Sequence, residues 1–297
     1  MSLPPLLAPA LHVISGKGGT GKTTVAAGLA CALAAGGRRV LVCEVEGRQG
    51  LAEAFGVPPL KASEEPRLAL LPDGGEVFGL NVDAEDALAE YLATFYRLGI
   101  AARAMDRFGL FDFATSIAPG LRDVLLTGKV YEAVRRRARG RPNSYDAVVL
   151  DAPPTGRIGS FLNVHSAISG LAKVGPIRNQ ADSIVSLMRS PATVVHLVTL
   201  LEDMPVTETI EAVDDLAAAA AGTLDLAVPG LSEAQDTALR AEFAEDAGLI
   251  IDERERYERL LSLGLPLVTV PTIPGGIDRG AVITIADRLR EKLGAAA

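Results

Sequence analysis

The sequence predicts an α/β fold built on a doubly wound, mostly parallel sheet. Short apolar segments typical of buried strands alternate along the chain with longer segments of helical periodicity. In addition, the first apolar segment is followed by a glycine-rich loop and then by an alanine- and leucine-rich segment, which is the order strand, turn, helix. The predicted strands cover about 11–14, 40–45, 78–83, 146–150, 193–199, 224–228 and 267–270.

Length and composition limit the class of protein. The chain has 297 residues, 48% of them hydrophobic, which is enough for a large buried core. The formal net charge of -8 argues against binding to a nucleic-acid backbone. Cys31 and Cys43 are too few for a disulfide framework and lack metal-ligand spacing. No apolar run approaches the ~20 residues that a membrane helix needs, so we expect no integral membrane segment. Together with the low cysteine count, this predicts a cytoplasmic protein whose thiols are reduced.

The loop after the first predicted strand has the residues of a phosphate-binding site. It contains Gly16-x4-Gly21-Lys22-Thr23, the P-loop pattern G-x-x-x-x-G-K-[ST]. Glycines let backbone N–H groups face phosphates, and the N-terminus of the following helix adds a positive dipole. Lys22 is expected to reach the β- and γ-phosphates, and the Thr23 hydroxyl to bind Mg²⁺. The predicted nucleotide-binding residues are Gly16, Gly18, Gly19, Thr20, Gly21, Lys22, Thr23 and Thr24.

Lys17 is a second lysine that this phosphate chemistry does not need. It comes just after the first glycine, so we expect it to point out of the loop, where it would suit a nucleotide on another subunit. The pattern K-G-G-x-G-K-T resembles the deviant Walker A motif of dimeric P-loop ATPases, which include the arsenical-pump ATPase, the tail-anchored-protein targeting ATPase, the septum-site and plasmid-partition ATPases and the nitrogenase iron protein. The resemblance implies a catalytic Lys17 that acts across a dimer. A cation in this role, like an arginine finger, raises the rate of hydrolysis by roughly 10³–10⁵-fold. A solvated surface lysine is the alternative.

The segment 44-EVEGRQGLAEAFG-56 resembles switch I of the arsenical-pump and tail-anchored-targeting family, which reads D-P-A-H-S-L-x-D-A-F. When the two are aligned from Ala54 and Phe55, the water-activating Asp falls on Glu46, and 47-GRQ-49 replaces Pro-Ala-His. The resemblance implies that Glu46 positions the attacking water, with its carboxylate moved out by one methylene. An ordinary exposed glutamate at a strand end is the alternative.

A further carboxylate, Asp151, ends the predicted strand 146–150, at the Walker B position where a carboxylate holds Mg²⁺ through water. The continuation D-A-P-P-T-G-R resembles the family's D-T-A-P-T-G-H, with Arg157 in place of His. We therefore expect Thr23 and Asp151 to bind the metal together.

The segment 267-LVTVPTIPGGIDRG-280 resembles the family's last strand and its base-binding loop. This implies that Pro271, Thr272 and Ile273 contact the nucleotide base. The family's V-N-[RQK] motif, whose Asn reads adenine, is missing near Pro229. The residues leave base specificity open, and ATP and ADP are inferred from the family alone.

We expect one P-loop ATPase domain over residues 1–297, with a helical subdomain formed by insertions at about 84–139 and 163–190. Both insertions carry apolar residues at spacings of three and four, which is typical of amphipathic helices. The resemblance implies that this subdomain contacts a client, and we expect a groove for a hydrophobic client or small ligand. Plain core packing between the helices is the alternative.

The last predicted helix, residues 281–293, has an apolar side next to several basic residues. Such a helix resembles the membrane-seeking terminal helix of septum-site ATPases. Because it is short and weakly apolar, packing on the sheet is favoured.

The resemblance extends from about residue 11 to about residue 293 and is strongest to an actinobacterial branch in which two such chains occur as a pair. It implies a Mg²⁺-dependent dimeric ATPase, either a homodimer or a heterodimer with a related chain, whose nucleotide state switches the helical subdomain. The alternative is a regulatory subunit that binds nucleotide but hydrolyses it weakly. A partition- or septum-type ATPase acting on DNA or membrane is disfavoured by the acidic charge and by the D-A-P-P-T-G-x-x-x-x-L continuation.

Overall fold

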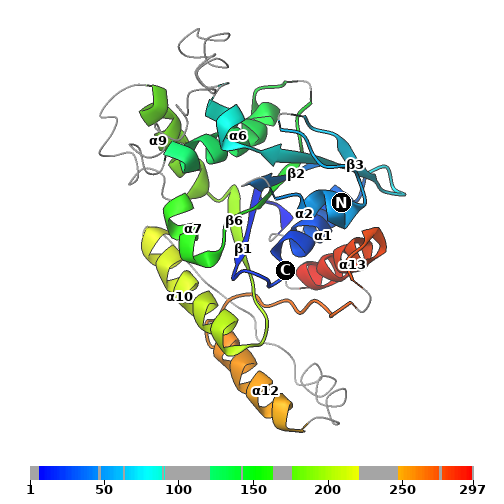
Figure 1. Ribbon diagram of the computed structural model, residues 1–297, viewed down its shortest axis with the longest axis vertical. Coiled ribbons are helices and arrows are strands. Elements are labelled where there is room, and N and C mark those ends of the chain that lie inside the picture. The colour runs from blue at the N-terminus through cyan, green and yellow to red at the C-terminus, as the bar shows by residue number, and fades with distance from the viewer. Residues whose placement is uncertain are drawn as a thin grey trace.

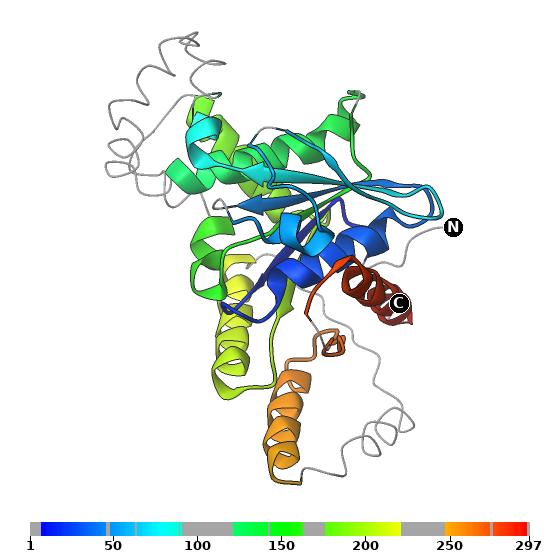
Figure 2. The same ribbon diagram turned by 45° about the vertical axis from the view of Figure 1, so that its right-hand side comes forward.

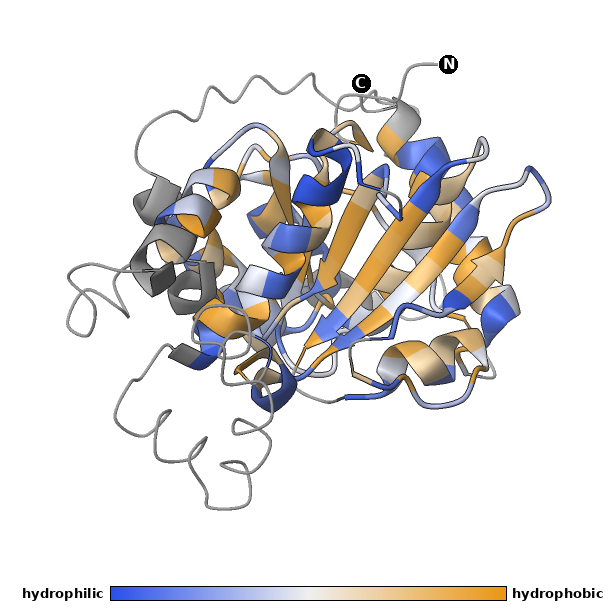
Figure 3. Ribbon diagram, turned by 90° about the horizontal axis from the view of Figure 1, so that it is seen from above, coloured by the Kyte–Doolittle hydropathy of each residue, from blue (hydrophilic) through white to orange (hydrophobic). Residues whose placement is uncertain are grey.

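A computed structural model describes residues 7–45, 48–62, 64–88, 90, 121–141, 143–162, 176–220, 247–273 and 276–295. Within these residues the chain forms a six-stranded sheet of order β3-β4-β2-β5-β1-β6, with helices on both faces (Figures 1 and 3). The sheet is parallel except for β3, which pairs antiparallel with β4. The strands are β1 Leu11–Gly16, β2 Arg39–Val45, β3 Arg67–Leu70, β4 Glu76–Val82, β5 Ala147–Asp151 and β6 Thr193–Val198. The predicted doubly wound α/β fold is confirmed.

The strand register brings the carboxyl ends of three central strands together. β5 lies between β2 and β1, and Asp151 at its end is level with Glu44 of β2 and Ile14 of β1. In a parallel doubly wound sheet, ligands bind at this carboxyl edge. The order of the strands therefore places the loops after β1, β2 and β5 around one point.

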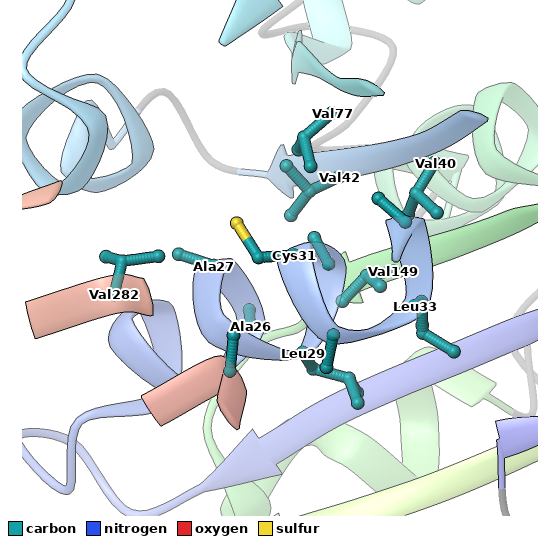
Figure 4. Close-up of a cluster of buried hydrophobic side chains, with 14 of the residues drawn as sticks. Ala26, Ala27, Leu29, Cys31, Leu33, Val40, Val42, Val77, Val149 and Val282 are labelled. Carbon is teal, nitrogen blue, oxygen red and sulfur yellow. The ribbon is translucent and has the colours of Figure 1, made fainter. Parts of the chain in front are cut away.

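The first face of the sheet is covered by α1 (Lys22–Ala34), α2 (Gly50–Phe55) and α13 (Arg279–Ala295). Side chains from α1, β2, β5 and α13 meet in one apolar cluster, as Figure 4 shows. Helices α1 and α13 approach closely at Gly28, where an added Cβ would lie 2.5 Å from Cγ2 of Ile285. The apolar side of α13 is buried in this contact, through Val282, Ile285, Ala286, Leu289 and Leu293. The terminal helix thus packs with its apolar side on α1.

The second face is covered mainly by α6 (Leu121–Ala138), α7 (Thr155–Leu162) and α9 (Pro176–Met188). Residues that alternate along the strands with those facing α1 fill this second cluster, which explains why the strands are mostly apolar (Figure 3). Helix α10 (Asp203–Ala220) packs beside α7, and α12 (Ala247–Leu261) extends from α10 away from the sheet in Figures 1 and 2. An ion pair of 2.7 Å between Arg256 Nε and Asp203 Oδ1 joins α12 to the start of α10.

Two predictions about strands need correction. Residues 67–70 were not among the predicted strands, but they form the short strand β3, which is stabilised by antiparallel pairing with β4. Residues 267–270, predicted as a strand, form none. Pro266 and Pro271 flank this segment and lack backbone N–H groups, and its valines instead pack singly against the α1 cluster. The predicted strand at 224–228 lies outside the described residues.

The predicted helical subdomain lies only in part within the described residues. Residues 91–120 and 163–175 are outside them, so the subdomain as a whole stays a prediction. Val124 of α6 and Ile184 of α9, two side chains considered for an apolar groove, are instead buried in a cluster between these helices. Along the described ranges, no helix combines the length and the apolar character that crossing a bilayer requires. Cys31 and Cys43 are both buried free thiols, as expected.

Candidate functional site

The loop between β1 and α1 holds its shape through glycines. At Gly16 an added Cβ would lie 2.0 Å from the carbonyl oxygen of Val198, so only glycine fits. Gly19 and Gly21 adopt φ values of +86° and +85°, which are strained for other residues. An added Cβ at Gly18, Gly19 or Gly21 would meet no atom within 4 Å, so this side of the loop faces open space. The backbone thus forms the turn that a phosphate-binding loop requires.

Lys22 begins α1 and is only 5% exposed. Its Nζ donates a hydrogen bond of 2.9 Å to the carbonyl oxygen of Lys17, which holds the ammonium group back over the loop. Burial lowers the pKa of Lys22, the charge of Asp151 raises it, and the charge of Arg48 lowers it. A buried ammonium with one backbone acceptor is suited to bind an anion entering the loop.

Thr23 and Asp151 are joined at the edge of the sheet, as a shared magnesium site would require. The Thr23 hydroxyl donates a hydrogen bond of 2.6 Å to Oδ2 of Asp151. The second carboxylate oxygen, Oδ1, is buried and accepts no hydrogen bond from the described residues. Burial raises the pKa of Asp151, while Thr23 and the charges of Arg48 and Lys22 lower it. A buried carboxylate that retains a free oxygen beside a threonine hydroxyl fits Mg²⁺, which prefers oxygen ligands.

Thr23 and Asp151 provide only a few metal ligands, as expected for an ion that is also bound by substrate phosphates and water. Across the part of the chain that the structure describes, no three His, Cys, Asp or Glu side chains are grouped to hold a metal. Mg²⁺ in phosphate-transferring sites is held by one or two protein groups together with substrate phosphates and water. Thr23 and Asp151 would hold the ion in this way, and the ion would neutralise charge on the phosphates.

Glu44 is a site residue that the sequence analysis missed. It is fully buried near the end of β2, and its carboxylate accepts hydrogen bonds from the backbone N–H groups of Gly50, at 3.0 Å, and Leu51, at 3.2 Å. Burial raises the pKa of Glu44 to about 7, although these two hydrogen bonds lower it. The signal available in the sequence was one acidic residue within the otherwise apolar segment 40–45.

The start of α2 lies directly against the P-loop helix. An added Cβ at Gly50 would lie 2.9 Å from Cγ2 of Thr23 and 3.6 Å from Oε1 of Glu44. The preceding Gln49 is held by two hydrogen bonds with the backbone of Leu60, of 2.8 and 3.1 Å. Arg48 precedes these fixed residues, and two of its guanidinium nitrogens, Nε and Nη2, are buried and have no hydrogen-bond partner within the described ranges.

The side chain of Lys17 turns away from the loop of its own chain. Its Nζ forms an ion pair of 3.1 Å with Glu208 of α10, and both side chains are partly exposed. The other carboxylate oxygen of Glu208 accepts a hydrogen bond of 3.3 Å from Thr155, which begins α7 directly after the D-A-P-P sequence. Lys17 is thus linked to the segment after β5, while only its carbonyl oxygen contacts Lys22.

The structure describes only some of the remaining predicted site residues. Glu46 lies outside the described residues, so its role stays a prediction. Pro271 and Thr272 are exposed, and Ile273 packs partly buried against the α1 cluster. Contact of these three residues with a base also stays a prediction.

Comparisons with known proteins agree with this geometry. A family model described as anion-transporting ATPase matches residues 10–226. ATPase BagA of Mycobacterium tuberculosis is 45% identical over 316 residues, which cover 95% of this chain and 93% of the relative. ATPase GET3 of Chaetomium globosum is 30% identical over 204 residues, covering 67% of this chain and 56% of the relative. ATPase GET3 of Podospora anserina is 28% identical over 177 residues, covering 58% and 48%.

These matches confirm the resemblance that the motifs indicated. The family model covers the P-loop, the start of α2, the Asp151 edge and the Glu208 helix in one continuous stretch. Since the relatives are named as ATPases, they support ATP hydrolysis as the general activity. The chain belongs to the anion-transporting ATPase family.

Proposed function

We propose that this chain is a Mg²⁺-dependent ATPase whose nucleotide site is formed by the P-loop, Thr23 and Asp151. The observation that carries the proposal is the contact between Thr23 and Asp151, with one buried carboxylate oxygen free, next to the buried ammonium of Lys22. Lys22 would bind the β- and γ-phosphates, and Glu46 would position the attacking water. ATP and ADP follow from the family.

We further propose that the active form is a dimer in which Lys17 contacts the nucleotide of the partner chain. The orientation of Lys17 supports this, because its ammonium pairs with Glu208 and leaves the phosphate loop of its own chain to Lys22. Release of the γ-phosphate would change the contacts of the segment after β5, to which Thr155 belongs and which is hydrogen-bonded through Thr155 to Glu208 of α10. In this way hydrolysis would switch the helical subdomain, whose client we propose to be hydrophobic, between two states.

The proposal is tested by measuring phosphate release against protein concentration and by mixing two variants. Lys17→Ala and Lys22→Ala are each expected to be nearly inactive alone. Mixed in equal amounts they should recover up to about a quarter of the wild-type rate per chain, because half of the dimers are mixed and each of those has one complete site. A mixture that stays inactive, while the wild type hydrolyses ATP, would contradict the action of Lys17 across the dimer.

A second candidate function is favoured by the switch I segment, where 47-GRQ-49 and Glu46 replace the family's D-P-A-H. A shift of about 1 Å in a catalytic group can cost about 10²-fold in rate. The chain would then be a weakly hydrolysing subunit whose Lys17 completes the site of a related partner. Wild-type protein that binds ATP but releases no phosphate at any concentration would establish this alternative over the first.

A further inference from the structure

Arg48 stands at a position where the backbone is held firmly against the nucleotide site. The next residue, Gln49, exchanges two hydrogen bonds with the backbone of Leu60. Gly50 donates to the buried carboxylate of Glu44 and lies against the side chain of Thr23. The residues that follow Arg48 are therefore fixed by Leu60 and by groups on β2 and α1 that border the site.

Among the residues that the structure describes, two donors of the Arg48 guanidinium group have no acceptor. Its Nε and Nη2 atoms are buried and have no hydrogen-bond partner. The nearby carboxylate of Glu44 already accepts two backbone N–H groups, and Oδ2 of Asp151 accepts the Thr23 hydroxyl. Buried charged donors without a partner are costly, so their retention points to a partner that arrives from outside.

The charge of Arg48 acts on the groups of the P-loop site. This positive charge lowers the pKa of Lys22, of Asp151 and of Glu44. Two cations, Lys22 and Arg48, thus share one buried region and repel each other. A multiply charged anion between them would relieve this repulsion and would accept the free donors of both.

We propose that Arg48 is a phosphate-binding residue that acts within its own chain and whose guanidinium group binds the terminal phosphate of ATP. This rests on the proposed function, in which Lys22 and the Thr23–Asp151 pair hold the nucleotide. The terminal phosphate is the one expected on this side, because Gly50 packs on Thr23, and Thr23 would hold a metal ion that neutralises charge on the terminal phosphates. The guanidinium fork matches phosphate geometry, whereas a lysine acts only as a point charge. Arg48 then distinguishes ATP from ADP without help from a second chain.

The test is equilibrium binding of two nucleotides, measured by calorimetry with Mg²⁺ on the full chain. The probes are ADP and the imido analogue of ATP, which is not hydrolysed. Arg48→Ala should lose about 10- to 100-fold in affinity for the analogue, the loss of a hydrogen bond to a charged group, and less than about twofold for ADP. Arg48→Lys, which keeps the charge and most of the apolar stem, should lose affinity in the same direction by a smaller factor. Guanidinium ion at millimolar concentration should restore part of the loss in Arg48→Ala.

Arg67→Ala is the matched control, because Arg67 lies on the edge strand β3 and pairs with Glu76 rather than with the site. It should bind both nucleotides as the wild type does. Equal affinities of wild type and both Arg48 variants for the analogue, or equal losses for the analogue and ADP, would overturn the inference and leave the proposed function standing. Wild-type protein that binds neither nucleotide would overturn both. Thermal unfolding of each variant shows whether a loss comes from misfolding, and Arg48→Lys is the decisive variant if Arg48→Ala is unfolded.

Discussion

The P-loop and the start of α2 border the same site but are specified in different ways. The P-loop obtains its shape from glycines close in sequence, and Gly16 and Gly21 are required by a close approach and a positive φ. The start of α2 is instead held by Glu44 from β2, by Thr23 from α1 and by Leu60 from a later loop. One region is defined by a local motif, and the other by contacts that only the folded sheet brings together.

The two regions also differ in how their charges are balanced. In the P-loop the buried Lys22 has a backbone acceptor. Beside α2, two nitrogens of Arg48 and one oxygen of Asp151 are buried and find no hydrogen-bond partner in the part of the chain that the structure describes. Because such groups are costly to bury, the part of the site nearest α2 is the part that a ligand would complete. The P-loop is therefore shaped by its own glycines, whereas the charged groups beside α2 would be paired by a bound anion and a bound cation.

The largest effect is expected from Lys22→Ala, which removes the charge at the centre of the P-loop. ATP turnover should fall by at least about 10²–10³-fold, because an electrostatic contact to the transferred phosphate is lost. Thermal stability should be unchanged or higher, since burial disfavours the charged form of Lys22 and lowers its pKa. The exposed Lys61→Ala serves as a control for phosphate-release assays and unfolding curves. Unchanged turnover would show that Lys22, and with it the P-loop, takes no part in the reaction.

Gly50→Ala tests whether the start of α2 must touch the P-loop helix. The added methyl would lie 2.9 Å from Cγ2 of Thr23, so α2 or Thr23 has to move. A displacement of about 1 Å at a catalytic group costs up to about 10²-fold, and we expect a loss of that order in turnover with a smaller change in stability. The exposed Glu53→Ala on the same helix should leave the rate unchanged. If Gly50→Ala turned over ATP as the wild type does, contact between the two regions would be irrelevant to the reaction.

The same contrast explains which parts of the site can be predicted from the sequence. The P-loop, Thr23 and Asp151 were predicted, because a fixed spacing and a strand end identify them. Glu44 was missed because it lies inside an apolar segment, and its partners, the N–H groups of Gly50 and Leu51, become visible only when α2 folds back on β2. Arg48 was noted only as a departure from the family pattern. Its role depends on which buried donors remain free, and spacing cannot reveal that.

The errors in the predicted fold have a similar origin. The strand β3 depends on antiparallel pairing with β4, and the prolines and charged residues around it do not form a strand pattern. The segment 267–270 has the composition of a strand, but it pairs with none of the described strands. The central strands were predicted correctly because burial on both faces favours apolar residues at most positions.

Glu44 gives a smaller effect that depends on pH. Its pKa is about 7 in the native state, above the ordinary value for glutamate, so between these values the native protein binds a proton that the unfolded chain does not. Stability contributed by Glu44 is therefore present at acid pH and is lost as the pH rises through 7. Relative to Glu44→Gln, the wild type should lose about 2 kcal/mol of unfolding free energy between pH 5.5 and 8.

The measurement is urea unfolding of the nucleotide-free protein at both pH values. Glu53→Gln on the exposed side of α2 is the matched control and should show no such difference. A constant gap between wild type and Glu44→Gln across this range would mean that Glu44 is ionised throughout and that burial does not control its charge.

The most direct test of the central claim, that Asp151 and Thr23 hold Mg²⁺ for ATP hydrolysis, is the rate of phosphate release against Mg²⁺ concentration. The wild type and Asp151→Asn are compared, because the amide keeps the size of the side chain and an acceptor for the Thr23 hydroxyl. We predict a wild-type rate that rises from near zero in chelator and levels off, and a rate for Asp151→Asn that is lower by about 10²-fold or more, the scale expected for loss of a preorganised charge. A wild-type rate that persists in chelator, or an Asp151→Asn curve that coincides with that of the wild type, would contradict the claim.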